Sequence, residues 1–136
     1  MIGFNTMEKK TLDINPLLVE AANSTRRMLM NRRYFVRDVL LIDENVMDVV
    51  AIKEGLIISE KWRIRLIIPP AHGGLGTIPV QAFFREQRRV HDVKGFMISL
   101  GPISIQAKRL IEKENIPVFP QSWLKENSDF GSLEEN

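Results

Sequence analysis

Two apolar segments that follow each other closely in the middle of the chain constrain the fold most. Met47–Ile52 and Leu56–Ile68 are separated only by Lys53–Gly55, and Pro69 and Pro70 follow the second segment. Runs of this kind, rich in β-branched residues, are typical of strands. A pair of prolines must end the second strand, because proline cannot donate to the hydrogen-bond ladder of a sheet. The sequence therefore predicts two antiparallel strands joined by a tight turn.

The residues before this pair predict a strand and a helix. Tyr34–Ile42 is rich in aromatic and β-branched residues and is expected to add a third strand to the antiparallel meander. Asn15 and Pro16 favour a helix start, since asparagine is a good cap and proline is tolerated in the first turn. We expect this helix to run to about Asn31.

The second half of the chain predicts helices and a parallel strand pair. A helix is expected from about Thr77 to Val90, followed by a strand at Lys94–Leu100. Ser104 is expected to cap a helix that reaches about Asn115, and Ile116–Phe119 reads as a short strand. A strand, helix and strand of this length pair in parallel. We therefore expect an α/β fold with a central mixed β-sheet, an antiparallel meander plus a parallel βαβ unit, flanked by helices.

Length and composition suit one domain. The chain has 136 residues, and a hydrophobic content of 44% is enough for a real core. We expect a loose lead-in over residues 1–14, a single domain over 15–125 and an acidic, disordered tail over 126–136. The tail is expected to stay solvated because its acids stand among serine, asparagine and glycine.

Several classes of protein are excluded by what the chain lacks. It has no cysteine and only two histidines, so disulfides, thiolate zinc sites and most histidine-based metal sites are excluded. No apolar run approaches the roughly 20 residues that span a bilayer. The sequence therefore predicts a cytoplasmic protein that does not contact a membrane.

Positive charge is concentrated in two windows although the net charge is only +2. Five arginines lie between Arg26 and Arg37, and a second group surrounds Arg88. Local basic clusters attract polyanions even when the net charge is small, so contacts of Arg26, Arg33 and Arg88 with phosphate groups are expected. The alternative is that these arginines form ordinary solvent-exposed helix faces.

Three side chains around the predicted hairpin supply the parts of a metal nuclease. Asp48 lies on the first strand, and Glu60 and Lys61 lie on the second. Phosphodiester hydrolysis needs hard oxygen ligands for Mg²⁺ and a nearby cation. Because side chains alternate along a strand, Ser59, Lys61, Arg63 and Arg65 are expected on one face and Glu60 on the other. Glu60 and Lys61 can then share one site only if a β-bulge between them turns both side chains to the same face of the sheet.

The order of these elements resembles the PD-(D/E)xK restriction-endonuclease-like superfamily. The segment Asp48–Gly55 followed by Lys61 is similar to the Mrr-type restriction endonucleases and the archaeal Holliday-junction resolvases, and so is Lys94–Ser99 with the helix after Ser104. The similarity covers roughly residues 15 to 120. It implies a mixed sheet with a DNA-binding cleft.

The resemblance also implies roles for particular residues. Asp48 is the expected first ligand of Mg²⁺, with Glu60 or Glu20 as further ligands, and Lys61 is the expected catalytic lysine. Arg63 and Arg65 are expected to contact phosphate. The second acid of the family pattern falls on Ser59.

Three readings of function follow from these residues. The first is a DNA-binding, Mg²⁺-dependent endonuclease. The second is an inactive nuclease-fold subunit that binds DNA or serves as a scaffold in a larger assembly. The third is a protein-interaction module that forms a homodimer. In the plainest structural alternative, Asp48 only ends a turn and Lys61 is a solvated strand residue.

Overall fold

The structure, a computed structural model, describes residues 14–135. Its elements follow along the chain in the order α2 (Pro16–Asn31), β1 (Phe35–Asp43), β2 (Val46–Lys53), β3 (Glu60–Ile67), α3 (Thr77–Arg88), β4 (Lys94–Ser99), α4 (Ile105–Glu114), β5 (Val118–Pro120) and α5 (Gln121–Glu135). None of these helices is long and apolar enough to cross a bilayer.

The strands form one mixed sheet of five strands in the order β1-β2-β3-β4-β5. β1, β2 and β3 pair antiparallel, whereas β3, β4 and β5 pair in parallel. The antiparallel meander extended by a parallel βαβ unit, which the sequence predicts, is therefore confirmed. The register of β2 and β3 places Asp48 opposite Arg65 and Val50 opposite Arg63. Opposite residues of an antiparallel pair lie on the same face of the sheet, so this register positions the site described below.

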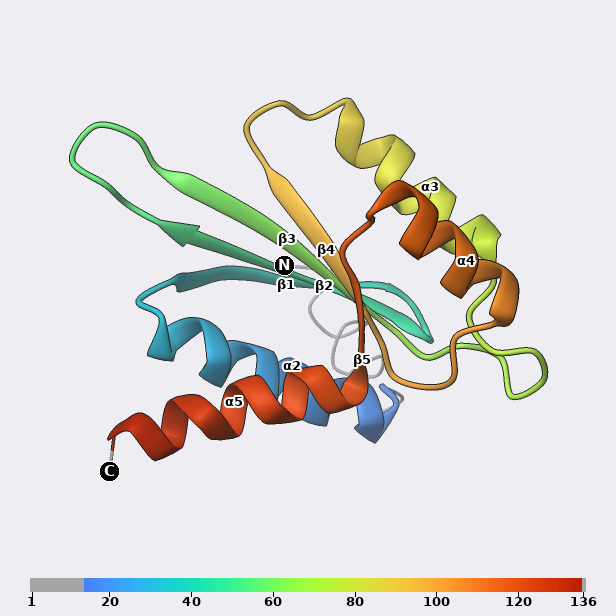
Figure 1. The fold of residues 1–136 in the computed structure, drawn as a ribbon. Coiled ribbons are helices and arrows are strands. Elements are labelled where there is room, and N and C mark those ends of the chain that lie inside the picture. Colours follow the sequence, from blue (N-terminus) through green and yellow to red (C-terminus); the bar gives the residue numbers. More distant parts are fainter. Residues whose placement is uncertain (1–13, 136) are drawn as a thin grey trace, which may run out of the picture.

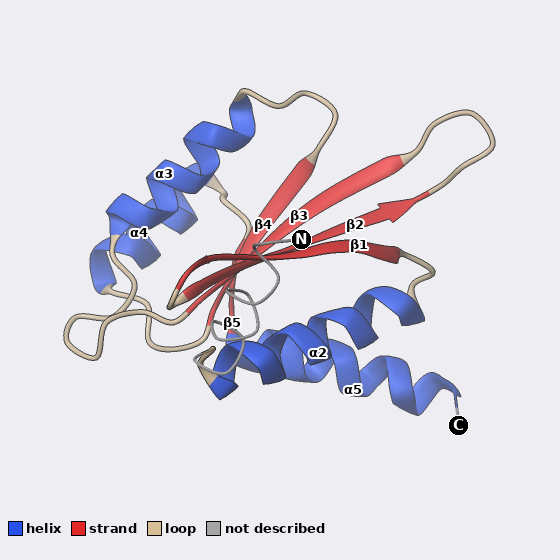
Figure 2. Ribbon diagram, turned by 180° about the vertical axis from the view of Figure 1, so that it is seen from behind, coloured by secondary structure: helices blue, strands red, loops and turns tan. Residues whose placement is uncertain are grey.

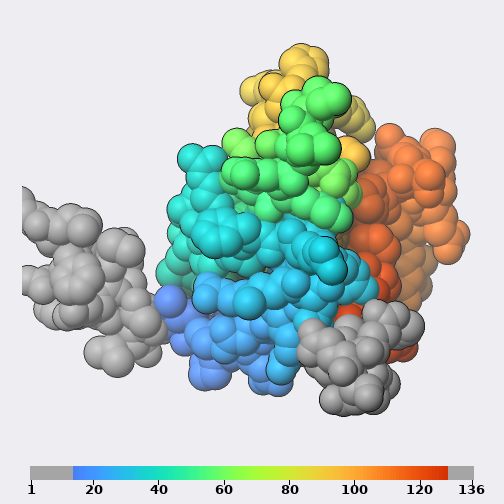
Figure 3. All heavy atoms as spheres, turned by 90° about the vertical axis from the view of Figure 1, so that its left-hand side faces the viewer, coloured from blue at the N-terminus to red at the C-terminus, as the bar shows by residue number. Residues whose placement is uncertain are grey.

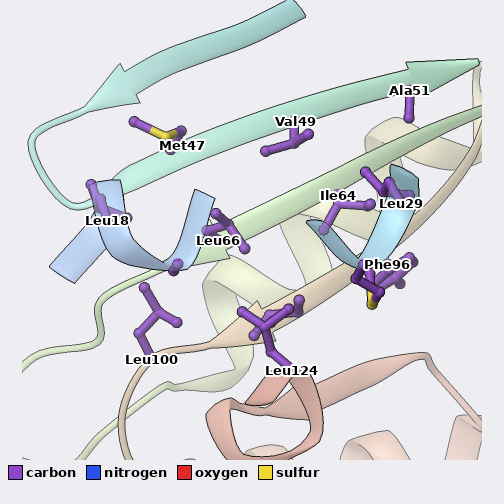
Figure 4. Close-up of a cluster of buried hydrophobic side chains, with 13 residues drawn as sticks. Leu18, Leu29, Met47, Val49, Ala51, Ile64, Leu66, Phe96, Leu100 and Leu124 are labelled. Atoms are coloured by element: carbon purple, nitrogen blue, oxygen red, sulfur yellow. The ribbon is translucent and has the colours of Figure 1, made fainter. Parts of the chain in front are cut away.

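Helices cover both faces of the sheet. α2 and α5 run beside each other on one face, and α3 and α4 lie together on the other (Figures 1 and 2). Strand alternation divides the core between these two layers. Met47, Val49 and Ala51 of β2 pack toward α2 and α5, together with Leu18 and Leu124, as Figure 4 shows. The opposite face packs a second cluster around Phe83 and Met97. Asp48 therefore lies on the α3 side of the sheet.

The helix ends follow the signals in the sequence. The side chain of Asn15 accepts a hydrogen bond from the amide of Leu17 at 2.9 Å, and Pro16 begins α2. Ser104 accepts from the amide of Ala107 at 3.1 Å and begins α4. Both predicted caps are confirmed, and each satisfies one of the backbone donors that a helix start leaves without an intrahelical partner.

The β2–β3 connection is longer than the sequence predicts. β3 begins at Glu60 instead of Leu56, because the ladder between the two strands ends at the pair of Lys53 and Glu60. Leu56, Ile57 and Ile58 are 106%, 95% and 76% exposed, so this apolar run is a projecting loop and not a buried strand. The loop extends beyond the rest of the sheet in Figure 1.

The end of the chain differs from the expected disordered tail. α5 continues as a helix to Glu135, across most of residues 126–136. Its first turns are anchored, since Leu124 is 2% exposed and Trp123 packs against the core. A helix held at one end by apolar contacts extends more readily into a polar segment, because elongation is easier than nucleation. The expected lead-in of residues 1–14 lies, apart from Ile14, outside the described residues.

Candidate nucleic-acid interface

Asp48 is a buried carboxylate held by two arginines. Asp48 is only 3% exposed to solvent. Arg65 donates from Nε to Oδ1 at 2.8 Å and from Nη2 to Oδ2 at 3.0 Å, and Nε of Arg63 lies 3.2 Å from Oδ2. Both oxygens of Asp48 are therefore engaged by guanidinium groups that come from β3, the neighbouring strand. A bidentate arginine contact of this kind is among the stronger polar contacts in proteins.

The two guanidinium groups lie between the sheet and α3. The Cζ atoms of Arg63 and Arg65 lie 4.5 Å and 4.9 Å from the ring centre of Phe83. Nη1 of Arg63 also donates to Oε1 of Glu86 at 2.9 Å. This hydrogen bond from Arg63 is the main reason that the pKa of Glu86 lies below its ordinary value. The cluster joins β2, β3 and α3 through charge and aromatic contacts together.

Glu60 lies on the opposite face of the sheet, as strand alternation predicts. It accepts a hydrogen bond from the Tyr34 hydroxyl at 3.1 Å, and Nζ of Lys94 lies 3.5 Å from its other oxygen. Burial, followed by the contact with Glu60, raises the pKa of Tyr34. Lys61 follows Glu60 and, by alternation, belongs to the face of Asp48, where it is half-buried.

The three expected metal ligands are not brought together. Glu20 lies on α2 and lines a groove against α5 with Lys125, on the side of the sheet away from Asp48. Within residues 14–128, whose side chains the structure describes, aspartate, glutamate and histidine form no group of three that suits a metal ion. Because the oxygens of Asp48 are held by arginines and Glu60 points the other way, the residues present do not fit an Mg²⁺ site.

A groove of about 570 Å³ runs between α2 and the start of β1. Its basic side chains are Arg26 on α2, Arg33 in the turn that follows α2, and Arg37 on β1. Tyr34 and Phe35 also line it, and Phe35 is 72% exposed. The groove thus combines positive charge with an aromatic ring that is open to solvent. Figure 3 shows this side of the molecule, with β1 in cyan shades above α2 in blue.

The positive charge of this groove is only weakly neutralised by neighbouring side chains. Arg37 lies 3.7 Å from Asp38, and both side chains are more than half exposed, so water screens their attraction. Arg26 and Arg33 are exposed and make no ion pair with any described residue. The groove can therefore attract an anion without first breaking a strong internal ion pair.

Arg33 occupies a backbone conformation that favours glycine. Its φ is 66°, in the left-handed region. The amide of Arg33 donates to the carbonyl of Met30 and that of Tyr34 to Leu29, which is the hydrogen-bond pattern of a Schellman helix end. Glycine is usual at this position, and other residues there carry a cost of roughly 1–2 kcal/mol. Backbone strain of this kind is often retained where the side chain has a function.

The residues expected to bind nucleic acid are therefore split among three places. Arg26 and Arg33 lie together in the groove. Arg63 and Arg65 are largely buried beside Asp48, and each side chain is 15% exposed. Arg88 is exposed near the end of α3, away from the groove.

Two further residues of the groove were not among the expected site residues. Arg37 belongs to the same basic window of the sequence, which was the available signal. Phe35 carried no signal of its own, because aromatic residues are common in strands. Only the position of β1 at the sheet edge leaves its ring exposed.

Comparisons with known proteins add no family to this description. No family model, curated protein or solved structure matches the chain.

Proposed function

We propose that this chain is a DNA-binding domain that does not cleave DNA, a non-catalytic counterpart of the nuclease-like proteins that its sequence resembles. The observation that carries the proposal is the groove between α2 and β1, where Arg26, Arg33 and Arg37 meet beside the exposed ring of Phe35. Such a site can hold the backbone phosphates of a nucleic acid and stack on its bases.

The geometry of the groove suits a strand of nucleic acid better than a small anion. Three arginines line it, from α2, from β1 and from the turn between them, and none of the three is buried. Exposed arginines spaced along a groove can contact successive phosphates, and each such contact releases counterions from the nucleic acid. An aromatic side chain beside them adds contact with any base, since every base has a flat face.

The arrangement around Asp48 supports binding without hydrolysis. In the endonuclease reading, Asp48 must offer its oxygens to Mg²⁺. Here those oxygens accept from Arg65 and face Arg63, and their release would take the ion-pair partner from Arg65 and leave Arg63 with Glu86 alone. Asp48 thus serves the structure as a buried counter-ion. This assigns different roles to the two arginine groups, with Arg63 and Arg65 structural and the groove arginines functional.

The proposal is tested by fluorescence anisotropy with labelled single-stranded and duplex DNA. The double variant Arg26→Glu/Arg37→Glu reverses two charges in the groove, and we expect its affinity to fall at least about tenfold, with a smaller salt dependence. The matched control is Lys108→Glu/Arg109→Glu, which makes the same change in charge on exposed residues of α4.

The control separates the groove from the total charge. Equal losses in both double variants would mean that DNA responds only to net charge, and the proposed groove would be wrong. No salt-sensitive binding by the unaltered protein would remove the DNA-binding function altogether.

A protein-interaction role is the second candidate, and the β2–β3 loop favours it. Leu56, Ile57 and Ile58 stand almost fully in solvent at the end of the hairpin. Adjacent exposed apolar residues commonly mark contacts with other proteins. Replacing all three with serine is expected to leave the fold intact and to reduce self-association or partner binding, measured by light scattering during size-exclusion chromatography. Unchanged association would exclude the loop as the contact.

A further inference from the structure

A second hollow lies beside the groove, on the other side of the turn that joins α2 to β1. It has a volume of about 150 Å³. Three of its walls are aromatic side chains from separate elements, namely Trp62 of β3, Phe96 of β4 and Trp123 of α5. Tyr34 lines both this pocket and the groove. The two hollows thus share Tyr34 as a wall.

The walls of this pocket are held in fixed positions. Phe96 makes edge-to-face contacts with Trp62 at 5.7 Å and with Trp123 at 5.6 Å, measured between ring centres. Trp123 stacks on Phe119 at 4.3 Å. Aromatic contacts of this kind fix ring orientation as well as burying area. The pocket is therefore preformed and does not need to be opened by rearranging the core.

Its size matches one planar ring. A cavity of about 150 Å³ is known to hold a single benzene-sized molecule. A pyrimidine base is of that size class, and its faces suit stacking on indole and phenyl rings. The apolar lining also disfavours filling by ordered water, which needs several polar partners.

The rim of the pocket carries polar groups that suit a nucleotide. Arg32 lines it and donates to Oδ1 of Asn127 at 3.3 Å and to the carbonyl of Met28 at 3.1 Å. The indole N–H of Trp62 is buried beside the Tyr34 hydroxyl, with which it interacts without a hydrogen bond of good geometry. Tyr34 and Trp62 therefore place polar atoms next to the aromatic walls, and Arg32 and Asn127 add further polar groups at the rim.

We propose that this aromatic pocket, the Trp62–Trp123 pocket, receives one unpaired base of a DNA strand that lies in the groove. The inference rests on the proposed DNA-binding function and goes further by specifying single-stranded DNA. Arg33 lines the groove and its neighbour Arg32 lines the pocket. The backbone of a DNA strand in the groove would therefore pass this turn, and one base could point into the pocket. A base reaches such a pocket only when it is unpaired.

The test compares two strands with equal charge. The first is an oligothymidylate of about 12 nucleotides, and the second is a strand of the same length in which every nucleotide is abasic. The chain has only two tryptophans, and both line the pocket, so their fluorescence reports its occupancy directly. We expect the thymidylate strand to bind about 5- to 100-fold more tightly and to quench tryptophan emission.

The outcomes separate the inference from the proposed function. Equal, salt-sensitive binding of both strands without quenching would overturn the base pocket and leave groove binding standing. Binding of neither strand would overturn both. Tighter binding with quenching supports both.

A variant that fills the pocket gives a second, independent readout. Asn127→Phe adds a ring to a residue that lines the pocket, and Gln121→Phe adds the same ring to an exposed position of α5 outside it. We expect Asn127→Phe to remove the preference for thymidylate over the abasic strand while binding of the abasic strand is retained. Gln121→Phe is expected to keep the preference. If both variants keep it, the base does not enter this pocket.

Discussion

Arg65 donates to both carboxylate oxygens of Asp48, at 2.8 Å and 3.0 Å, across the central pair of strands. The two residues are directly opposite in the β2–β3 register. The residue that the sequence marks as a metal ligand is thus the counter-ion of a structural arginine, and it is nearly inaccessible to solvent. This one relationship changes the expected effect of removing Asp48.

Asp48→Asn tests that relationship through stability. The substitution keeps the shape of the side chain but removes its charge, which takes the counter-charge from Arg65 and leaves Arg63 with Glu86 as its remaining partner. We expect the free energy of unfolding to fall by about 3 kcal/mol, as for other broken buried ion pairs. Urea denaturation measures this. The control Asp92→Asn, at an exposed position, should change stability by less than about 0.5 kcal/mol. A gain in stability on replacing Asp48 would indicate a carboxylate held for a metal instead.

Glu86 is expected to make stability depend on pH in the acidic range. The pKa of Glu86 is lowered in the folded protein, first of all by its hydrogen bond from Arg63. Its stabilising contribution is therefore present above the ordinary value of 4.5 and is lost as pH falls through the lower folded pKa. We expect the stability difference between the unaltered protein and Glu86→Gln to shrink below that pH. A difference that is constant from neutral to acidic pH would contradict this.

Tyr34 is expected to titrate late on the alkaline side. Burial, with the neighbouring Glu60 adding to it, raises the pKa of Tyr34 above 10.0. Its contribution to stability is present below that value and is lost as pH rises through the folded pKa. Tyr34 is the only tyrosine of the chain, so tyrosinate absorbance follows it alone. Glu60→Gln should move the midpoint partway back, because burial remains. An ordinary midpoint in the folded protein would show that Tyr34 is not enclosed.

Arg33 allows stability and binding to be separated. Arg33→Gly relieves the left-handed backbone strain, and we expect unfolding to require about 0.5–1 kcal/mol more free energy while DNA affinity falls. Arg33→Ala removes the same charge but keeps the strain, so it should bind DNA as weakly as Arg33→Gly without becoming more stable. Thermal unfolding and anisotropy provide the two measurements. Full affinity in both variants would remove Arg33 from the interface.

The arrangement of the sheet could be predicted because it depends on local signals. Asn15 and Ser104 mark helix starts by hydrogen bonds to residues two or three positions away, and Pro69 and Pro70 mark the end of the third strand. The α/β class and the mixed sheet followed from such signals and from the length of the βαβ unit. The start of the third strand was predicted wrongly at the apolar run Leu56–Ile58, because composition alone does not distinguish exposed apolar residues from buried ones.

The candidate site was less predictable because it depends on partners that are distant in the sequence. Strand alternation correctly separated Glu60 from Arg63 and Arg65. It could not show that Asp48 lies opposite Arg65, since that requires the register of the hairpin. The groove was equally hidden, because Arg26 and Arg37 meet only through the packing of α2 against β1. The cluster of arginines was visible in the sequence, but the groove that they line was not.

Incubation of end-labelled DNA with the protein, with Mg²⁺ or with a chelator, distinguishes DNA binding by the groove from metal-dependent cleavage at Asp48. We expect equal, salt-sensitive binding in both conditions, weakened by Arg26→Glu/Arg37→Glu, and DNA of unchanged length on a denaturing gel. Cleavage that requires Mg²⁺ and disappears in Asp48→Asn and Lys61→Ala variants of confirmed fold would contradict this, because Asp48 would then be a metal ligand and not the counter-ion of Arg65.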